Sequence, residues 1–151
     1  MILYRITNAK YADDLSGNGA RLYGGRWNSE GRPAVYLASS RSLAILESLA
    51  HLVPTNTPDD YFMLTIDVPD NFITVDVRSL PADWNKYPEQ PFLKQLGNSF
   101  LAGKEHLLLK VPSVIVPDEY NYLMNPLHSN AAKVKIVKKD PFNFDSRLFS
   151  Q

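Results

Sequence analysis

Three residues between positions 17 and 51 have side chains suited to binding and cleaving a substrate that carries phosphates and a charged ring. Arg26 follows two adjacent glycines, Tyr36 lies in a short apolar segment, and Glu47 lies in a run with helical periodicity. The planar fork of an arginine suits phosphate or pyrophosphate, and a tyrosine face can stack on a flat cationic ring. A glutamate can hydrogen-bond ribose hydroxyls and stabilise positive charge that develops on a sugar. Together, these residue types suit the cleavage of a nicotinamide–ribose bond.

The same three residue types also occur together in ordinary surface loops, which leaves a second interpretation open. Arginines in glycine-rich loops often bind backbone carbonyl groups, so the chain could be a non-catalytic binding module with Arg26 as a structural anchor. Other chemistries lack their motifs, because the chain has no G-x-S-x-G elbow and no P-loop. Gly17 and Gly19 lack the third glycine of a dinucleotide fingerprint and follow no clear strand.

Composition excludes several further classes of function. A chain of 151 residues fits one domain, and its 16 basic residues balance its 16 acidic ones. It therefore has no net positive field of the kind that non-specific nucleic-acid binding requires. The absence of cysteine excludes disulfides, cysteine-based zinc sites and thiol nucleophiles, and His51, His106 and His128 are too scattered to suggest a metal site. With no signal peptide and no apolar run of roughly 20 residues, a cytoplasmic location without membrane contact is expected.

The segment that carries Glu47 is predicted to form a helix over 41–53, with Ser40 as its N-cap. Glu47 falls at the margin of the predicted buried face, where a charged side chain needs a partner or a task. A glutamate that turns outward to solvent is the alternative. The residues expected on the buried face follow 3.6-residue spacing and are Leu43, Leu46, Ala50 and Val53.

The remaining pattern predicts an α+β domain with mainly antiparallel sheets and a few short helices, because strands outnumber helices and do not alternate with them. The polar, glycine-rich segment 11–23 is expected to be a loop, and a second helix is expected over 90–102 with a stop at Gly103. The tail 141–151 is expected to pack on the core. A hairpin is predicted from the third and fourth of the expected strands, which are 2–6, 34–38, 61–68, 72–77, 107–111, 114–116, 120–124 and 133–138.

The sequence also resembles the RES domain, which is the toxin half of the bacterial Xre–RES toxin–antitoxin systems. An Arg, a Glu and a Ser shared across that family match Arg26, Glu47 and Ser113. The resemblance implies a single RES domain over 1–151. It is carried most specifically by RLYGGRWN (21–28), GRPAVYLA (31–38) and LAILESLAH (43–51), and it extends through YRI (4–6), YADDLSGNGA (11–20), VPSVIVP (111–117), NYLMNP (121–126) and a tail over 144–149.

The resemblance implies an ADP-ribosyltransferase-like fold of the diphtheria-toxin type, with NAD+ bound as substrate in a central cleft and no metal or other cofactor. Family members deplete NAD+ as glycohydrolases or phosphorylases, and mono-ADP-ribosylation of a protein is the alternative activity. The resemblance assigns the phosphates or ribose to Arg26, stacking on nicotinamide to Tyr36, and stabilisation of an oxocarbenium-like transition state to Glu47. Ser113 would orient Glu47 or the nicotinamide amide. The remaining residues expected to line the cleft and bind substrate are Arg5, Tyr23, Gly25, Trp27 and Asn125.

The same resemblance implies a partner. RES toxins arrest growth until an Xre-type helix-turn-helix antitoxin blocks the active site. The balanced charge of this chain fits a division of labour in which the antitoxin holds the DNA and the toxin makes no direct nucleic-acid contact. A homodimer is compatible with the sequence.

Overall fold

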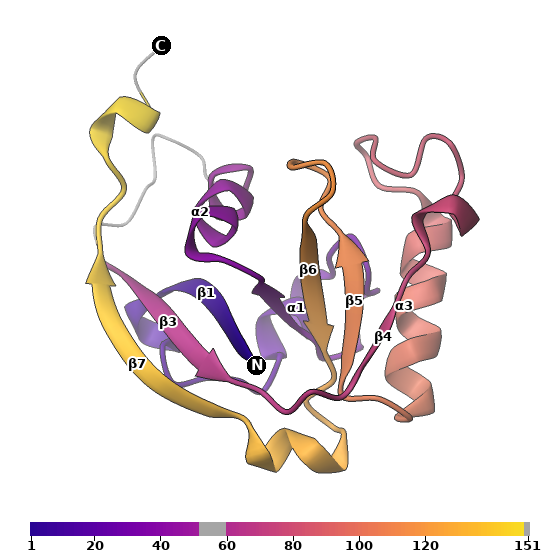
Figure 1. Ribbon diagram of the computed structural model, residues 1–151, viewed down its shortest axis with the longest axis horizontal. Helices are drawn as coiled ribbons and strands as arrows, with labels where there is room; N and C mark the ends of the chain where they lie inside the picture. Colours follow the sequence, from indigo (N-terminus) through magenta and orange to yellow (C-terminus); the bar gives the residue numbers. More distant parts are fainter. Residues whose placement is uncertain (52–59, 150–151) are drawn as a thin grey trace.

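A computed structural model describes residues 1–51 and 60–149, and the strands of this part of the chain form one seven-stranded sheet in the order β4-β5-β6-β2-β1-β3-β7 (Figure 1). All neighbouring pairs are antiparallel except β4 and β5. The α+β class with mainly antiparallel strands is therefore confirmed. The strands are β1 (Ile2–Asn8), β2 (Val35–Ala38), β3 (Tyr61–Asp67), β4 (Phe72–Thr74), β5 (Leu108–Pro112), β6 (Tyr120–Met124) and β7 (Lys135–Phe142).

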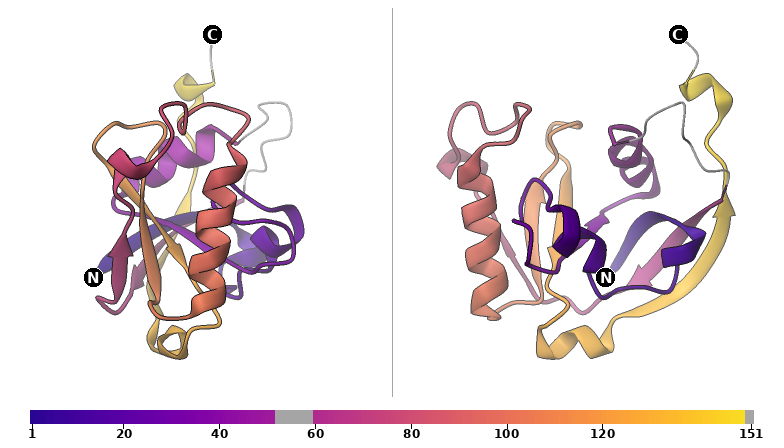
Figure 2. Two further views of the ribbon diagram at one scale, coloured as in Figure 1. Left: turned by 90° about the vertical axis from the view of Figure 1, so that its right-hand side faces the viewer. Right: turned by 180° about the vertical axis from the view of Figure 1, so that it is seen from behind.

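In the described residues, three α-helices lie against this sheet: α1 (Asn18–Tyr23), α2 (Arg41–Leu49) and α3 (Pro91–Gly103). In Figure 1, α2 lies between the half of the sheet with β1, β3 and β7 and the half with β6, β5 and β4. Figure 2 shows α3 covering the second half and α1 on the side hidden in Figure 1. In the described residues, no helix is long and apolar enough to cross a membrane. Short 3-10 helices fill the connections at Ala9–Tyr11, Val77–Ser79, Ser129–Lys133 and Ser146–Leu148.

The helix that carries Glu47 begins as the sequence predicts. The Ser40 hydroxyl oxygen accepts a hydrogen bond from the Leu43 backbone N–H at 3.1 Å, so Ser40 is its N-cap. The buried face differs from the prediction, because it is centred on Leu43 and Ala44, while Leu46 is 40% exposed. Since α2 packs against both β1 and β2, contact with the sheet rotates the helix away from the face that periodicity alone indicates. The predicted buried position Val53 lies outside the described residues.

Three other predictions of local structure were wrong. The expected hairpin from 61–68 to 72–77 does not form, because β4 crosses to the far end of the sheet and pairs in parallel with β5. The segment 11–23 includes helix α1 rather than being loop throughout. The segment 114–116 is a turn instead of a strand. Strand β4 has only three residues, and its partner elsewhere in the chain decides its pairing more than its own propensity does.

Helix α3 packs tightly against the glycine-rich loop around Trp27. Leu93 and Leu101 join the core formed with β5 and β6, and Trp27 is 3% exposed in the same core. At Gly97, an added Cβ would overlap the Trp27 backbone oxygen, so the helix and the loop touch backbone to backbone. The helix ends at Gly103, although Lys104 is the residue with left-handed backbone (φ 56°).

We expect Gly97→Ala to lower the free energy of unfolding by at least about 2 kcal/mol, because a methyl group at this contact forces the backbones of α3 and the loop apart. Equilibrium urea unfolding measures the change. Gly103→Ala in the same helix is the matched control, since its Cβ would meet nothing within 4 Å. The control should be neutral or stabilise by up to about 1 kcal/mol. Equal unfolding energies for Gly97→Ala and the parent would contradict the close contact.

Candidate active site

Glu47 is half-buried, and one edge of its carboxylate is held by two side chains from other parts of the chain. The Ser113 hydroxyl donates to Glu47 Oε1 at 2.8 Å, and Asn121 Nδ2 donates to the same oxygen at 2.7 Å. Glu47 Oε2 accepts no hydrogen bond from any described residue. The prediction that Glu47 lies at the margin of the core with a partner therefore matches its position, and its second oxygen is left for another donor.

The hydroxyl of Ser113 is fully used by these contacts. Its oxygen accepts hydrogen bonds from the backbone N–H groups of Ile115 and Val116, at 3.1 and 3.0 Å, and its one hydrogen is directed to Glu47. A serine hydroxyl has one donor and two acceptor sites. Of the two roles predicted for Ser113, the contacts correspond to orienting Glu47, and no donor is left for a nicotinamide amide.

The glycine-rich loop that presents Arg26 is built around Asn28. The Asn28 side chain is fully buried, and its Nδ2 donates to the carbonyl oxygens of Ala20, Ser29 and Arg32. Asn28 Oδ1 accepts from the Tyr36 hydroxyl at 2.6 Å. The Asn28 amide thus binds a residue of α1, two residues that follow it in the loop, and a residue of β2. Both polar atoms of the Asn28 side chain therefore have partners in the described residues, which stabilises one loop conformation.

Tyr36 supports the loop through its hydroxyl. That oxygen also accepts from the Trp27 backbone N–H at 3.1 Å, and burial raises the pKa of Tyr36 well above its ordinary value. The hydroxyl therefore keeps its proton and remains a donor to Asn28. A Cβ added at Gly25 would lie 2.5 Å from the Tyr36 hydroxyl oxygen, which explains why the second glycine of the pair is needed.

Arg26 is the residue of this loop whose charge remains at the surface of the site. Its Nη1 donates to the carbonyl oxygens of Trp84 and Lys86, at 3.2 and 3.1 Å. Its Nε and Nη2 make no hydrogen bond to the described residues. The guanidinium is therefore held by one corner, and the side with Nε and Nη2 keeps the paired donors that suit a phosphate.

Strands β2 and β6 bring Tyr36 and Asn121 to one face of the sheet. Tyr36 pairs with Leu123 and Ala38 with Asn121 across β2 and β6, so Tyr36 and Asn121 are diagonal neighbours roughly 7–8 Å apart on one face. Arg26 is close enough to lower the pKa of the Tyr36 hydroxyl against the effect of burial. The loop residue Arg26 is thus near Tyr36, Tyr36 is a diagonal neighbour of Asn121, and Asn121 binds Glu47 of α2.

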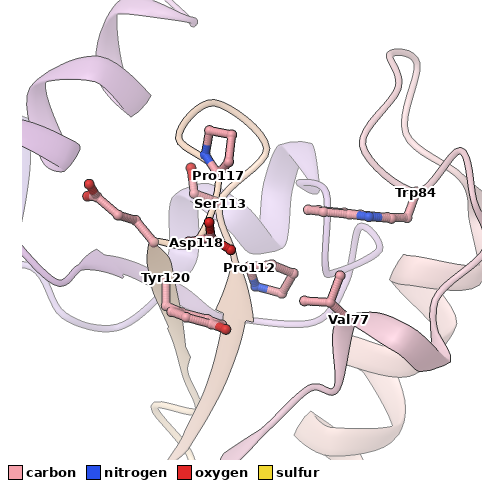
Figure 3. A pocket seen from close by; sticks show the side chains of 8 residues that line it. Val77, Trp84, Pro112, Ser113, Pro117, Asp118 and Tyr120 are labelled. Atoms are coloured by element: carbon pink, nitrogen blue, oxygen red, sulfur yellow. The ribbon is translucent and has the colours of Figure 1, made fainter.

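A pocket of about 160 Å³ lies next to these residues (Figure 3). Trp84 projects toward Pro112 from one side, and Ser113 lies at the opposite end. The Trp84 carbonyl oxygen accepts a hydrogen bond from Arg26, and the Ser113 hydroxyl donates one to Glu47. The pocket therefore adjoins residues that bind each of the two charged side chains. Pockets for whole ligands usually measure about 300–1,000 Å³, so this space fits only part of a dinucleotide. The lining residues are Val77, Trp84, Pro112, Ser113, Pro117, Asp118, Glu119 and Tyr120.

The structure does not bring the other predicted substrate-binding residues into contact with Glu47. Arg5 lies on the face of β1 opposite Tyr4 and donates to the Asp14 carbonyl oxygen at 2.8 Å. Burial lowers the pKa of the Arg5 guanidinium, and Asp14 opposes this shift. Tyr23 is 81% exposed at the end of α1.

Asn125 lies just beyond the end of β6 distant from Asn121. It is buried, its Nδ2 donates to the Leu101 carbonyl oxygen, and its Oδ1 accepts from the Leu127 N–H. These contacts join the end of α3 to the turn after β6. Trp27, with Gly25 beside it, similarly makes its contacts within the loop and core.

Two asparagines that matter to the site were missed at the sequence level. Asn121 stands among aromatic and apolar residues of a strand, and Asn28 directly follows the Arg-Trp pair. A polar residue inside an apolar strand was the available signal for Asn121. Within the described residues, no group of three or more His, Cys, Asp or Glu could hold a metal ion.

Comparison with known proteins identifies the family. A family model described as the RES domain matches residues 2–145. The chain belongs to the RES family. The Toxin Res of Photorhabdus laumondii subsp. laumondii is 44% identical over 98% of this chain and 97% of its own. The Prs ADP-ribosylating toxin of a Sphingobium species is 40% identical over 91% and 88%.

A third RES relative is the NAD(+) phosphorylase MbcT of Mycobacterium tuberculosis. It is 40% identical over an alignment 74 positions long, and the match covers 44% of this chain and 39% of MbcT. The crystal structure of the M. tuberculosis MbcT–MbcA toxin–antitoxin complex superposes with a TM-score of 0.77, covering 94% of this chain and 84% of the solved one at 23% identity. At 23% sequence identity, this superposition shows that the two chains share a fold.

The Asn28–Tyr36 contact predicts that Tyr36→Phe lowers the free energy of unfolding by about 1–3 kcal/mol, because the buried Asn28 Oδ1 and the Trp27 N–H lose their partner. Thermal and urea unfolding measure the loss. Tyr23→Phe is the control, since Tyr23 is exposed and its change should stay within about 0.5 kcal/mol. If both variants were as stable as the parent, the hydroxyl would not be supporting the loop.

Proposed function

We propose that this RES-family chain is the toxin of a toxin–antitoxin pair and that it consumes NAD+ by cleaving the bond between nicotinamide and ribose. Support comes from relatives named as toxins, as an ADP-ribosylating toxin and as an NAD(+) phosphorylase. The observation that carries the proposal is the carboxylate of Glu47, which is held through Oε1 and leaves Oε2 without a partner in the described residues.

This arrangement matches the demands of the reaction. Nicotinamide leaves as a neutral molecule, so no strong general acid is needed. Positive charge develops on the ribose, and a carboxylate fixed beforehand stabilises that charge without reorganising. Glu47 Oε2 is the atom we assign to this role. The serine and asparagine donors on Oε1 would keep the carboxylate from turning away.

Arg26 and Tyr36 would position the rest of the substrate. The Nε and Nη2 groups of Arg26 are available for the pyrophosphate while Nη1 stays on the 84–86 segment. We assign the Tyr36 ring the contact with the nicotinamide side of the dinucleotide, because Tyr36 on β2 is a diagonal neighbour of Asn121 on β6, which binds Glu47. Holding both ends of the substrate in one geometry contributes to the rate by itself.

The acceptor of the ADP-ribosyl group separates two candidate activities. A glycohydrolase or phosphorylase transfers it to water or phosphate, as the name of MbcT indicates for that relative. The alternative is mono-ADP-ribosylation of a protein, which the name of the Sphingobium relative favours. Purified protein incubated with NAD+, with and without phosphate, should yield free ADP-ribose or its phosphorylated form. Label from NAD+ that is retained on a protein band in lysate would instead show transfer to a protein. If NAD+ were lost in neither assay, the chain would be a non-catalytic binding module.

The partner and setting follow from the same proposal. The solved relative MbcT forms a toxin–antitoxin complex with MbcA, and we propose that an Xre-type antitoxin blocks the corresponding site of this chain in the cytoplasm. The chain 1–151 would form a single RES domain, as monomer or homodimer, with NAD+ as substrate and without a metal or other cofactor.

Glu47→Gln should lower kcat for NAD+ consumption roughly a hundred-fold or more, because the amide cannot stabilise a cationic ribose. Glu47→Ala should abolish both NAD+ loss and growth arrest. Glu105→Gln, an exposed carboxylate after α3, is the matched control and should keep parental kcat. A folded Glu47→Ala protein that destroys NAD+ at the parental rate would exclude Glu47 from the chemistry.

Arg26→Lys should raise KM for NAD+ roughly tenfold, because lysine keeps the charge but lacks the fork that binds phosphate oxygens in pairs. Initial rates across NAD+ concentrations give KM. Arg32→Lys in the same glycine-rich stretch is the control, because the Arg32 side chain is exposed. An unchanged KM in Arg26→Lys would remove Arg26 from phosphate binding.

A further inference from the structure

Asn121 occupies a rigid position beneath Glu47. It lies in β6 between two paired neighbours, opposite Ala38 of β2 and Val111 of β5. Its backbone is therefore fixed from both sides. Its Nδ2 reaches Glu47 Oε1 at 2.7 Å, slightly closer than the Ser113 hydroxyl at 2.8 Å.

The two donors restrict Glu47 in a way that one donor would not. Ser113 belongs to the turn after β5, and Asn121 belongs to the middle of the sheet, so the donors approach Oε1 from different elements. A carboxylate with a single donor can still rotate about that hydrogen bond. With two donors on one oxygen, the direction of the other oxygen is also set. A site supported by strands is held more closely than one supported by loops.

We propose that Asn121 is a positioning residue that aims Glu47 Oε2 at the reacting ribose. This inference rests on the proposed NAD+ cleavage. It assigns Asn121 the donation of one hydrogen bond through Nδ2 and no contact with the reacting atoms. The side chain acts through Glu47, so its loss should reduce turnover more than substrate binding.

The kinetic test compares two substitutions of Asn121. Asn121→Ala should lower kcat roughly ten- to hundred-fold with little change in KM, because a small misplacement of the carboxylate is costly. Asn121→Asp keeps the shape but replaces the donor with a carboxylate next to Glu47, so it should lose at least as much kcat. Asn130→Asp adds the same charge in the 3-10 helix after β6 and should retain parental kcat. Parental kcat in either Asn121 variant would overturn the proposal, and so would a loss confined to KM.

A second measurement needs no turnover and separates this inference from the proposed function. In the ¹⁵N NMR spectrum, the Asn121 side-chain proton bonded to Glu47 should be shifted downfield and exchange slowly with water. Glu47→Ala should move that signal upfield and speed its exchange. If the parent consumes no NAD+ but shows this signal, the proposed function fails and the positioning contact stands. An Asn121 signal that Glu47→Ala leaves unchanged would overturn the positioning role.

Discussion

The shared hydrogen bonding of Glu47 Oε1 by Ser113 and Asn121 is the constraint on which the site depends. A carboxylate removed from water is costly unless donors replace the lost solvation. Supplying two donors here requires α2 to follow directly after β2, and β2 to lie beside β6 in the sheet. The strand order therefore determines this contact, since it brings α2 next to the residues that follow β5 and begin β6, which are far from α2 in the sequence.

The second charged residue of the site is held by a similar device. Arg26 binds backbone carbonyls through Nη1 alone, and its loop is fixed from below by Asn28 and the Tyr36 hydroxyl. Glu47 and Arg26 are thus each bound on one side of the charged group, and the other side has no hydrogen bond to the described residues. Groups fixed before substrate arrives need not reorganise during reaction, which is the usual source of electrostatic catalysis. The two interpretations of Arg26, as anchor and as ligand for phosphate, are compatible because Nη1 serves as the anchor and Nε and Nη2 remain for the proposed phosphate.

Local patterns predicted the features that depend on nearby residues. The Ser40 cap and the marginal position of Glu47 follow from spacing within one helix, and the structure has both. The resemblance to the RES family paired Ser113 with Glu47. The amide of Asn121 could not be assigned, because its role depends on the pairing of β6 with β2, which lies far away in the sequence. The parallel pairing of β4 with β5 escaped prediction for the same reason, since a three-residue apolar strand fits either partner.

A crystal structure with a non-hydrolysable NAD+ analogue tests the central claim most directly. The measured quantity is the distance from each Glu47 carboxylate oxygen to the nicotinamide ribose. We predict that Oε2 lies within hydrogen-bond distance of a ribose hydroxyl while Oε1 keeps its bonds to Ser113 and Asn121. An analogue bound away from Glu47, or one that contacts the ribose only after Oε1 has left both donors, would contradict the account.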